Sequence, residues 1–375
     1  MLNFDPVALP QSSEQLRPVI RAFIADNLPE GRRNSDFTSG HDTSFSAALG
    51  AAGWIGMTVP KRYGGSERGY FDRYIVTEEL LAAGMPVAAH WITDRQTAPL
   101  LMSHGTEAQR ERFLPGICAG TVFFSIGMSE PNAGSDLAAI QTKAQAVEGG
   151  WRVNGTKLWT TGAHLNHYLM TLVRTTPASS NRHAGMSQLI IDLSSDGVEV
   201  RPIVSMTGQG EFNEVVLNDV FVPTDALVGN EGDGWQQVTS ELGYERSGPE
   251  RFLSTFRVFQ ELVNLVGVSP TAEQAAAVGR IGSQLMSLRR LSLSVAGMLQ
   301  ADKSPNIEAA MVKDLGTRFE KLSLEIARLA APAEGDRTAF DQALNDSLLL
   351  SPSFTLRGGT SEILRGMIAR GLGLR

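Results

Sequence analysis

Cysteine is almost absent from this sequence, and its scarcity excludes several classes of protein. The chain has 375 residues and a single cysteine, Cys118. One thiol cannot form an intrachain disulfide, and it cannot supply the ligands of a cysteine-based metal cluster. We therefore expect a protein of a reducing compartment, with a cytoplasmic location.

Long apolar runs and blocks of positive charge are also missing. No uninterrupted run of about 18 apolar residues occurs, and residues 1–6 contain no basic segment that leads into an apolar one, so we expect neither a membrane span nor an export signal. The net charge is −7, and basic pairs such as Arg32 with Arg33 are isolated. This distribution lacks the electrostatic footprint of a nucleic-acid-binding protein.

What is abundant indicates a large folded protein. Hydrophobic residues make up 42% of the chain and charged residues 19%, which excludes disordered and collagen-like proteins. A chain of this length is longer than a typical single domain, so we expect several packed units.

The first third of the chain, residues 1–122, has a helical period. Apolar residues recur every three or four positions across residues 16–24, after a predicted N-cap at Ser12 or Ser13. A second helix is predicted over residues 71–83. A third is predicted to begin after Thr106, whose hydroxyl can cap it.

The middle segment, residues 123–230, has the period of strands. Residues 142–147 alternate, residues 148–150 form a turn, and Asn154 with Gly155 predicts a tight hairpin. Further extended segments are predicted at residues 168–174, 187–193, 198–204 and 214–222. A small β-barrel or sandwich would account for these strands.

The last segment, residues 231–375, returns to the helical period. Pro249 suits a first helical turn, and long helices are predicted over residues 271–300 and 306–329. Helices, then strands, then helices, with no βαβ alternation, predict an α+β protein rather than a doubly wound nucleotide fold. The predicted domains are therefore residues 1–122, 123–230 and 231–375.

Several common catalytic and nucleotide-binding motifs are incomplete or absent in this chain. Residues 208–213 lack the third glycine of a dinucleotide fingerprint, and no phosphate loop or nucleophile elbow is present. His164 and His167 have no third metal ligand nearby, so we expect a surface or structural role for them and predict no metal site.

Two stretches carry more information. In residues 124–136 a strand end gives way to a loop of small, turn-forming residues whose backbone amides could face a ligand. In residues 154–162 an aromatic ring and two hydroxyl groups come together, which would suit one wall of a planar heterocycle. A tryptophan that fills the barrel core beside a polar turn explains the second stretch equally well.

Together with five other segments, these stretches closely resemble the acyl-CoA dehydrogenase family over nearly the whole chain. The other segments are residues 59–65, 105–115, 212–223, 229–234 and 358–365. The resemblance implies an N-terminal α-helical domain, a middle β-domain and a C-terminal four-helix bundle that together hold FAD. It also implies oxidation of an acyl-CoA to the trans-2-enoyl-CoA, transfer of the electrons to an electron-transferring flavoprotein, and a homodimer or homotetramer.

Matching the family motifs residue by residue assigns the site. The residues that the resemblance places beside the flavin are Ile126, Met128, Ser129, Ser135, Trp159, Thr160, Thr161, Thr360, Ser361 and Glu362. Among them, Thr161 would lie close to flavin N5. Ser135, Arg246 and Gly359 are the residues it places near the substrate, although Arg246 could instead only tie helices together.

The catalytic base departs from the commonest family pattern. A glutamate usually precedes the Gly-Thr-Ser of the terminal motif, and this chain has Gly358 there. A minority of members, similar to isovaleryl-CoA dehydrogenase, carry the base in a Leu-x-x-Glu-Arg segment, which residues 242–246 match. We therefore predict Glu245 as the base, with a pKa raised by burial in an apolar acyl pocket. A structural pairing with Arg246 or Arg251 remains the alternative, and Glu362 is the nearest competing carboxylate.

Two further departures from the family pattern concern the cofactor. Residues 254–259 and 341–350 lack the patterns that serve the FAD adenosine end in the family. A flavin monooxygenase or oxidase on the same scaffold is the alternative enzyme class. A third hypothesis is a non-catalytic flavin-binding scaffold, because Gly358 stands where most family members have the base.

Overall fold

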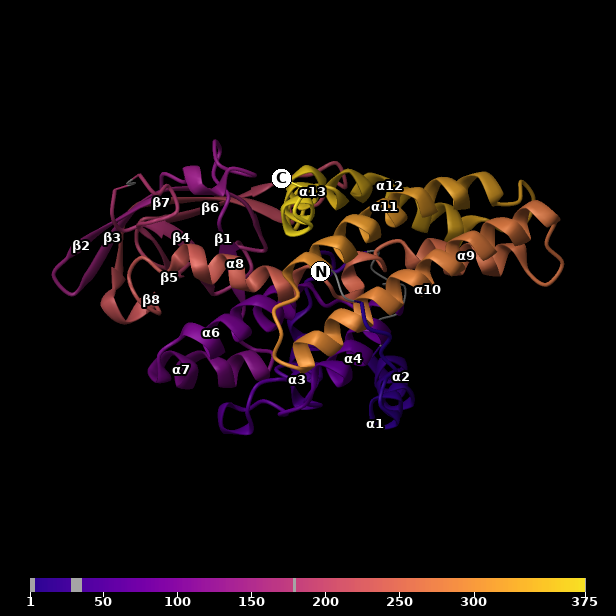
Figure 1. The fold of residues 1–375 in the computed structure, drawn as a ribbon, viewed down its shortest axis with the longest axis horizontal. Coiled ribbons are helices and arrows are strands. Elements are labelled where there is room, and N and C mark those ends of the chain that lie inside the picture. The colour runs from indigo at the N-terminus through magenta and orange to yellow at the C-terminus, as the bar shows by residue number, and fades with distance from the viewer. Residues whose placement is uncertain (1–3, 28–35, 178–179, 375) are drawn as a thin grey trace. The chain divides into compact units, whose positions relative to one another are not determined.

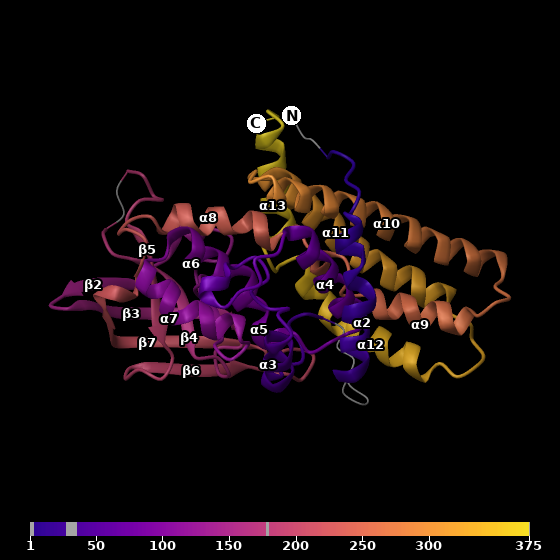
Figure 2. The same ribbon diagram turned by 90° about the horizontal axis from the view of Figure 1, so that it is seen from below.

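The chain divides into two compact units, each assembled from segments that are distant in sequence. The computed structural model describes residues 4–27, 36–177 and 180–374, without the side chains of 241–245. Unit 1 comprises Met1–Ser39, Gly69–Pro86 and Leu242–Arg375, and unit 2 comprises Gly40–Arg68 and Val87–Glu241. Figures 1 and 2 trace both units from two directions. The predicted limits of three domains do not follow this division and stay a prediction.

The secondary-structure elements of unit 1 are helices in the part of the chain that the structure describes. Its elements are α1 (Gln11–Glu14), α2 (Leu16–Asn27), α4 (Tyr70–Ala82), η5 (Pro249–Arg251), α9 (Phe256–Val266), α10 (Ala272–Gln300), α11 (Asn306–Ala330), α12 (Thr338–Phe354) and α13 (Ser361–Gly371). The helices predicted over 71–83, 271–300 and 306–329 are confirmed as α4, α10 and α11. The predicted cap at Ser12 or Ser13 is wrong, because the Ser13 hydroxyl instead donates to Asp72 at 2.6 Å.

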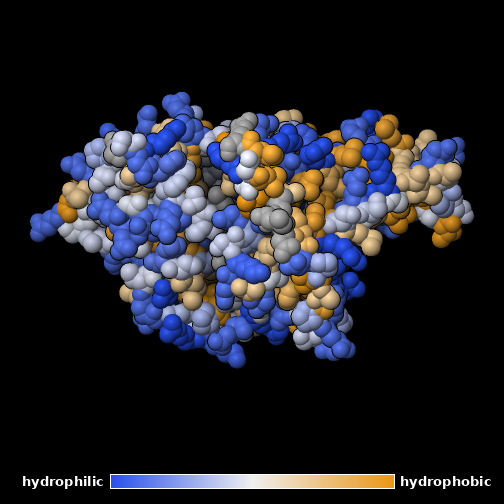
Figure 3. All heavy atoms as spheres, in the orientation of Figure 1, coloured by the Kyte–Doolittle hydropathy of each residue, from blue (hydrophilic) through white to orange (hydrophobic). Residues whose placement is uncertain are grey.

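The long helices of unit 1 bury an apolar core between them. Helix α10 packs against α11, and α12 packs against α9 and α11 (Figures 1 and 2). Phe252, Phe319 and Phe340 are among the buried residues of this core. Hydrophobic residues also recur on the outside of these helices in Figure 3. Unit 1 therefore keeps apolar surface in addition to its own core.

A buried ionic cluster joins the N-terminal and C-terminal segments of unit 1. Arg357, in the loop between α12 and α13, pairs with the buried Asp36 and lies 3.5 Å from the Glu320 carboxylate of α11. Its guanidinium also donates to Ser254 Oγ at 2.7 Å. Burial raises the pKa of Glu320, although Arg357 opposes that rise. The cluster fixes the loop that leads into α13.

Unit 2 combines short helices with a mixed sheet. Its helical elements are α3 (Thr43–Ala51), η1 (Lys61–Tyr63), α5 (Ala88–Ile92), η2 (Thr93–Thr97), α6 (Ala98–His104), α7 (Glu107–Cys118), η3 (Leu137–Ala139), η4 (Thr224–Ala226) and most of α8 (Gly234–Glu245). Thr106 caps α7, as predicted, and it also forms a capping box with Gln109.

Eight strands of the described chain form one sheet. They are β1 (Phe124–Gly127), β2 (Lys143–Val147), β3 (Gly150–Thr161), β4 (Tyr168–Arg174), β5 (Met186–Asp192), β6 (Val198–Ile203), β7 (Phe212–Pro223) and β8 (Leu227–Val228). The order is β6-β7-β3-β2-β4-β5-β8, and β1 pairs with β4 in parallel. The predicted segments 142–147, 168–174, 187–193, 198–204 and 214–222 are confirmed to within two residues at each end.

The hairpin predicted at Asn154 and Gly155 is wrong. Strand β3 runs through both residues and pairs with β7, with a register shift between Val153 and Gly155. The Asn154 side chain accepts a hydrogen bond from the Asp219 amide at 2.8 Å instead of closing a turn. The turn between β2 and β3 lies at Glu148 and Gly149, which the sequence analysis also identified as a turn.

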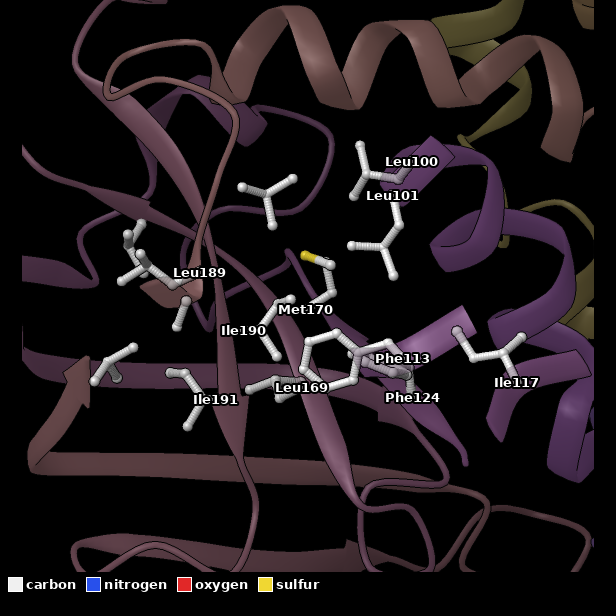
Figure 4. Close-up of a cluster of buried hydrophobic side chains, with 14 of the residues drawn as sticks. Leu100, Leu101, Phe113, Ile117, Phe124, Leu169, Met170, Leu189, Ile190 and Ile191 are labelled. Atoms are coloured by element: carbon white, nitrogen blue, oxygen red, sulfur yellow. The ribbon is translucent and has the colours of Figure 1, made fainter. Parts of the chain in front are cut away.

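The core of unit 2 lies between this sheet and the helices α6 and α7. Figure 4 shows Leu100 and Leu101 of α6 and Phe113 of α7 turned toward side chains of β4 and β5. Phe124 packs edge-on against Phe113, with ring centroids 5.4 Å apart. This packing fixes β1, and the predicted ligand loop begins where β1 ends.

Candidate functional site

The first part of the predicted site is the loop that follows β1 in unit 2. Ile126, Met128 and Ser129 are half-buried, and Ser135 is exposed. The backbones of Glu130 and Ala133 exchange hydrogen bonds of 2.9 and 3.1 Å, which closes a tight turn. The loop is therefore folded on itself.

A buried carboxylate anchors this loop to the sheet. Glu130 Oε2 accepts from the Gln141 amide at 2.6 Å, and Oε1 accepts from the Thr142 amide at 3.0 Å and from Lys157 Nζ at 2.8 Å. Burial would raise the pKa of Glu130, but Lys157 and these donors lower it below its usual value. Glu130 is thus held as a carboxylate.

Lys157 joins the two informative stretches of the sequence. Its side chain is fully buried in β3, and Nζ lies 3.2 Å from the Met128 carbonyl in addition to its bond with Glu130. The Leu158 amide also donates to the Ser129 carbonyl at 2.8 Å. Desolvation lowers the pKa of Lys157 to about 8, although the Glu130 carboxylate opposes this shift. The loop and β3 are therefore held together as one wall.

Trp159 occupies a bulge at the end of β3. The register with β7 shifts between Lys157 and Thr160, and Trp159 has a left-handed φ of 61°. A non-glycine residue in this conformation is strained by about 1–2 kcal/mol, and such strain is typical of functional sites. Trp159 is 57% exposed, and its ring contacts Phe212 edge-on. The open alternative, a tryptophan that fills the core, is therefore wrong.

The residues beside Trp159 fit a bound heterocycle. Thr160 Oγ1 is buried, and no hydrogen-bond partner for it lies among the described residues. Buried hydroxyl groups normally have partners, so a polar ligand atom would complete this one. Thr161 is half-buried next to it. An exposed aromatic ring and a buried hydroxyl without a partner suit a planar cofactor that carries polar atoms, such as a flavin.

The second part of the predicted site is the start of α13 in unit 1. Thr360 caps this helix by accepting from the Ile363 amide at 3.4 Å. Glu362 is exposed, and its pKa is lowered by its own backbone N–H and by the Thr360 hydroxyl. Ser361 Oγ is buried without a partner in the described part of the chain. These helix-terminal donors are suited to the oxygens of an anionic group.

Two buried cations hold the glycines before α13. Arg246 Nε donates to the Gly358 carbonyl at 3.0 Å, and Lys313 Nζ donates to the Gly359 carbonyl at 2.7 Å. Gly358 and Gly359 have φ values of 65° and 94°, which favour glycine. The contacts of Arg246 thus include the terminal motif, and its predicted contact with substrate, like that of Gly359, stays a prediction.

The predicted base lies outside the described side chains. Glu245 is the last residue of α8, but the structure does not describe the side chains of residues 241–245. Its catalytic role and its raised pKa therefore stay predictions. Among the described residues, no group of three or more histidine, cysteine, aspartate or glutamate side chains could hold a metal ion.

Sequence reasoning missed three residues that build this site. Lys157, Glu130 and Asn213 were not singled out, yet all are buried beside the predicted ligand wall. The sequence did contain a signal for Lys157. Alternate residues of a strand point to the same face, and Lys157 is on the same alternation as the buried Trp151 and Val153 of β3.

Two family models match the chain in sequence order. The model of the acyl-CoA dehydrogenase N-terminal domain matches residues 10–121, and that of the middle domain matches residues 125–220. The acyl-CoA dehydrogenase FadE29 of Mycobacterium tuberculosis (strain ATCC 25618 / H37Rv) is 33% identical, over 97% of this chain and 97% of its own. The chain belongs to the acyl-CoA dehydrogenase family. Members of the acyl-CoA dehydrogenase family are flavin-dependent oxidoreductases, so the predicted enzyme class is confirmed.

Solved structures of acyl-CoA dehydrogenase relatives share the fold. The Tcur3481-Tcur3483 steroid ACAD has a TM-score of 0.86 at 27% identity and covers 100% of both chains. The ChsE4-ChsE5 complex from Mycobacterium tuberculosis has a TM-score of 0.85 at 28% identity and covers 99% of both chains. The predicted α+β class, with a β-domain between two helical domains, is confirmed. No described helix is both long and apolar enough to cross a bilayer.

Removal of the exposed ring is a direct test of the ligand wall. Trp159→Ala is expected to weaken flavin binding at least tenfold, because the cofactor loses an aromatic contact worth about 1.4 kcal/mol or more. The apoprotein should lose at most about 2 kcal/mol of unfolding free energy, since Trp159 is more than half exposed already. Flavin fluorescence titration measures the affinity, and Leu165→Ala, at a residue that is 47% exposed, is the control. Equal affinities of the two variants would contradict the assignment.

Proposed function

We propose that this chain binds FAD and catalyses the α,β-dehydrogenation of an acyl-CoA thioester to the trans-2-enoyl-CoA. The observation that carries the proposal is the exposed Trp159 ring beside the Thr160 hydroxyl, which is buried without a partner among the described residues. Lys157 and Glu130 hold this wall, together with Met128 and Ser129 of the loop, in one place. In unit 1, the backbone amides at the start of α13 and the Thr360 hydroxyl are suited to an anionic group.

The chemistry requires one basic carboxylate from this chain. Glu245 takes the proton from the carbon next to the thioester carbonyl. Burial that raises the pKa of this carboxylate makes it a stronger base. When bound, FAD supplies an acceptor for the hydrogen that leaves the β-carbon as hydride. Hydrogen-bond donors around the thioester oxygen stabilise the charge that develops there. An electron-transferring flavoprotein is the proposed acceptor of the electrons.

The names of the relatives support a narrower substrate class. The Tcur3481-Tcur3483 protein is a steroid ACAD, and it is 27% identical to this chain over its full length. We extend that class to this chain and propose a CoA thioester whose acyl group carries a bulky fused-ring system.

The assembly is a further part of the proposal. Both solved relatives are named as pairs of different chains, which favours a hetero-oligomer beside the homodimer or homotetramer expected from the resemblance. A groove of about 780 Å³ between α10 and α11, lined by Leu288, Leu315 and Phe319 among others, offers apolar surface for either assembly. Light scattering on the chain, alone and with a second family member, distinguishes these assemblies. A cytoplasmic location belongs to the same proposal.

The test is flavin reduction without oxygen. The FAD-loaded protein is mixed anaerobically with short, branched, long and steroid-derived acyl-CoAs while the flavin absorbance is followed. We expect bleaching with at least one thioester, fastest with the steroid-derived one, and slow reoxidation by air. Rapid reoxidation by air would favour the oxidase class. Absence of bleaching with every thioester, alone and with a partner chain, would contradict the proposal.

A further inference from the structure

The bulge at Trp159 leaves two backbone carbonyls that receive side-chain donors. Asn213 Nδ2 donates to the Thr160 carbonyl at 2.9 Å, and the Ser125 hydroxyl donates to the Thr161 carbonyl at 2.8 Å. Both donor residues are 0% exposed. They come from different strands, β7 and β1, so two separate elements bind the backbone that follows the bulge.

Each donor is itself held by further side chains. His164 Nδ1 lies 2.8 Å from Asn213 Oδ1, so the imidazole N–H donates while the amide of Asn213 points at the carbonyl. On the other side, Asn166 Nδ2 donates to Ser125 Oγ at 3.0 Å, and Asn166 Oδ1 lies 3.2 Å from His41 Nε2. All of these residues belong to unit 2. We call the two chains of contacts the Asn213 arm and the Ser125 arm.

The two arms explain how the left-handed conformation of Trp159 is stabilised. A left-handed φ at Trp159 is unfavourable for a large side chain and persists only where the surroundings impose it. Regular pairing between β3 and β7 is interrupted at this point. A buried carbonyl that loses its hydrogen-bond donor costs free energy. Each arm therefore stabilises the bulged conformation relative to a regular strand.

We propose that Asn213 and Ser125 are positioning residues, which set the backbone of residues 159–161 so that the Trp159 ring and the threonine hydroxyls meet the cofactor. This inference rests on the proposed flavin-binding function. Neither residue needs to touch the cofactor, because each acts through the carbonyl that it holds.

Two nearly isosteric variants remove one donor each. Asn213→Asp keeps the shape of the side chain but replaces the N–H donor by a carboxylate oxygen, which repels the Thr160 carbonyl. Ser125→Ala removes only a hydroxyl group, so this variant is expected to fold even if Asn213→Asp does not. The matched control is Thr175→Val, because Thr175 follows β4 and its hydroxyl lies 2.9 Å from Ser187 Oγ, its one hydrogen-bond partner among the described residues.

The first readout needs no cofactor. Amide hydrogen exchange of the full-length apoprotein is followed in peptides that cover residues 158–162. We expect exchange there to be at least tenfold faster in Asn213→Asp and in Ser125→Ala than in the wild type, while Thr175→Val leaves these amides unchanged. Equal exchange in Ser125→Ala and Thr175→Val would overturn the positioning role.

The second readout uses the flavin-loaded protein. Both variants are expected to bind FAD at least tenfold more weakly and to show an altered visible circular dichroism of the flavin, whereas a merely structural loss would lower stability and leave that spectrum unchanged. Wild-type affinity and spectrum in both variants would overturn the inference. If the wild type bound no FAD, the proposed function would fail by itself, and the exchange experiment would still decide whether the arms hold the bulge.

Discussion

Glu245→Gln is expected to slow the reduction of bound flavin by an acyl-CoA about 10³-fold and to leave the FAD content unchanged. An amide has the size of the carboxylic acid but cannot accept the α-proton, and a general base contributes about 10² to 10⁴ to a rate. The usual position of the base holds Gly358, which has no side chain to replace the lost carboxylate. Anaerobic stopped-flow absorbance measures the rate.

Two other carboxylates serve as comparisons for Glu245. Glu231→Gln changes an exposed carboxylate just before α8 and is expected to keep the wild-type rate. Glu362→Gln tests the competing carboxylate at the start of α13, and it should weaken cofactor binding more than it slows the chemical step. A fast Glu245→Gln variant together with a slow Glu362→Gln variant would transfer the role of base to Glu362.

A relocated carboxylate extends this test. In the double variant Glu245→Gln/Gly358→Glu, the glutamate returns to the position that most family members use. We expect about a tenfold recovery of the rate over Glu245→Gln alone. Recovery should be incomplete, because Gly358 has a φ of 65° and a side chain there costs about 1–2 kcal/mol. No recovery would indicate that this chain cannot present a base from the terminal motif.

Lys157→Met is expected to lower the free energy of unfolding by about 3–5 kcal/mol and to release FAD. The variant leaves the Glu130 carboxylate buried without its counter-ion, and broken buried pairs cost about this much. The loop after β1 also loses the bond from Nζ to the Met128 carbonyl. Urea unfolding at pH 7 gives the stability, and the flavin absorbance of the purified variant gives the cofactor content.

The pKa of Lys157 gives the stability of the wild type a pH dependence of definite sign, which Lys157→Met removes. The pKa of Lys157 falls from 10.5 in the unfolded chain to about 8 in the folded one, so the unfolded state binds more protons between these values. The unfolding free energy of the wild type therefore gains a contribution that rises with pH between about 8 and 10.5, and the variant lacks it. Urea titrations of both proteins across this window measure the difference.

Two further variants separate the ion pair from a general loss of charge. Lys143→Met removes an exposed lysine from the neighbouring strand β2 and should change the stability by less than about 0.5 kcal/mol. Glu130→Gln/Lys157→Met removes both charges and should regain part of the loss, because no unpaired charge stays buried. A double variant that is less stable than Lys157→Met would show that the pair is not the cause.

The elements that local sequence determines were predictable. Thr106 and Thr271 each begin a helix with a glutamine three residues later, and both form capping boxes within their own turn. Asn154 failed as a hairpin signal because its side chain bonds to the Asp219 amide, 65 residues away in the sequence. Ser13 failed as a cap because Asp72 binds its hydroxyl. In both cases a distant partner determined the local structure.

The candidate site divides in the same way. The resemblance assigned Trp159 and Thr160 to the cofactor, and this assignment stays a prediction. The structure shows Trp159 exposed and the Thr160 hydroxyl buried without a partner among the described residues. Lys157 and Glu130 escaped notice because charged residues are usually solvated, and their pairing spans 27 positions. No local pattern in the sequence indicates the role of Asn213. Its side chain donates to the Thr160 carbonyl beside a bulge in another strand, β3.

The discontinuity of unit 1 has a consequence for synthesis on the ribosome. Residues 40–241 are consecutive except for the segment 69–86, so unit 2 can complete its core while the rest of the chain is still being translated. Asp36 emerges early, yet its counter-ion Arg357 follows 321 residues later. The first helices of unit 1 are therefore made long before the residue that neutralises Asp36. A stop codon between residues 320 and 357 would leave both Asp36 and Glu320 without the Arg357 guanidinium that compensates their burial.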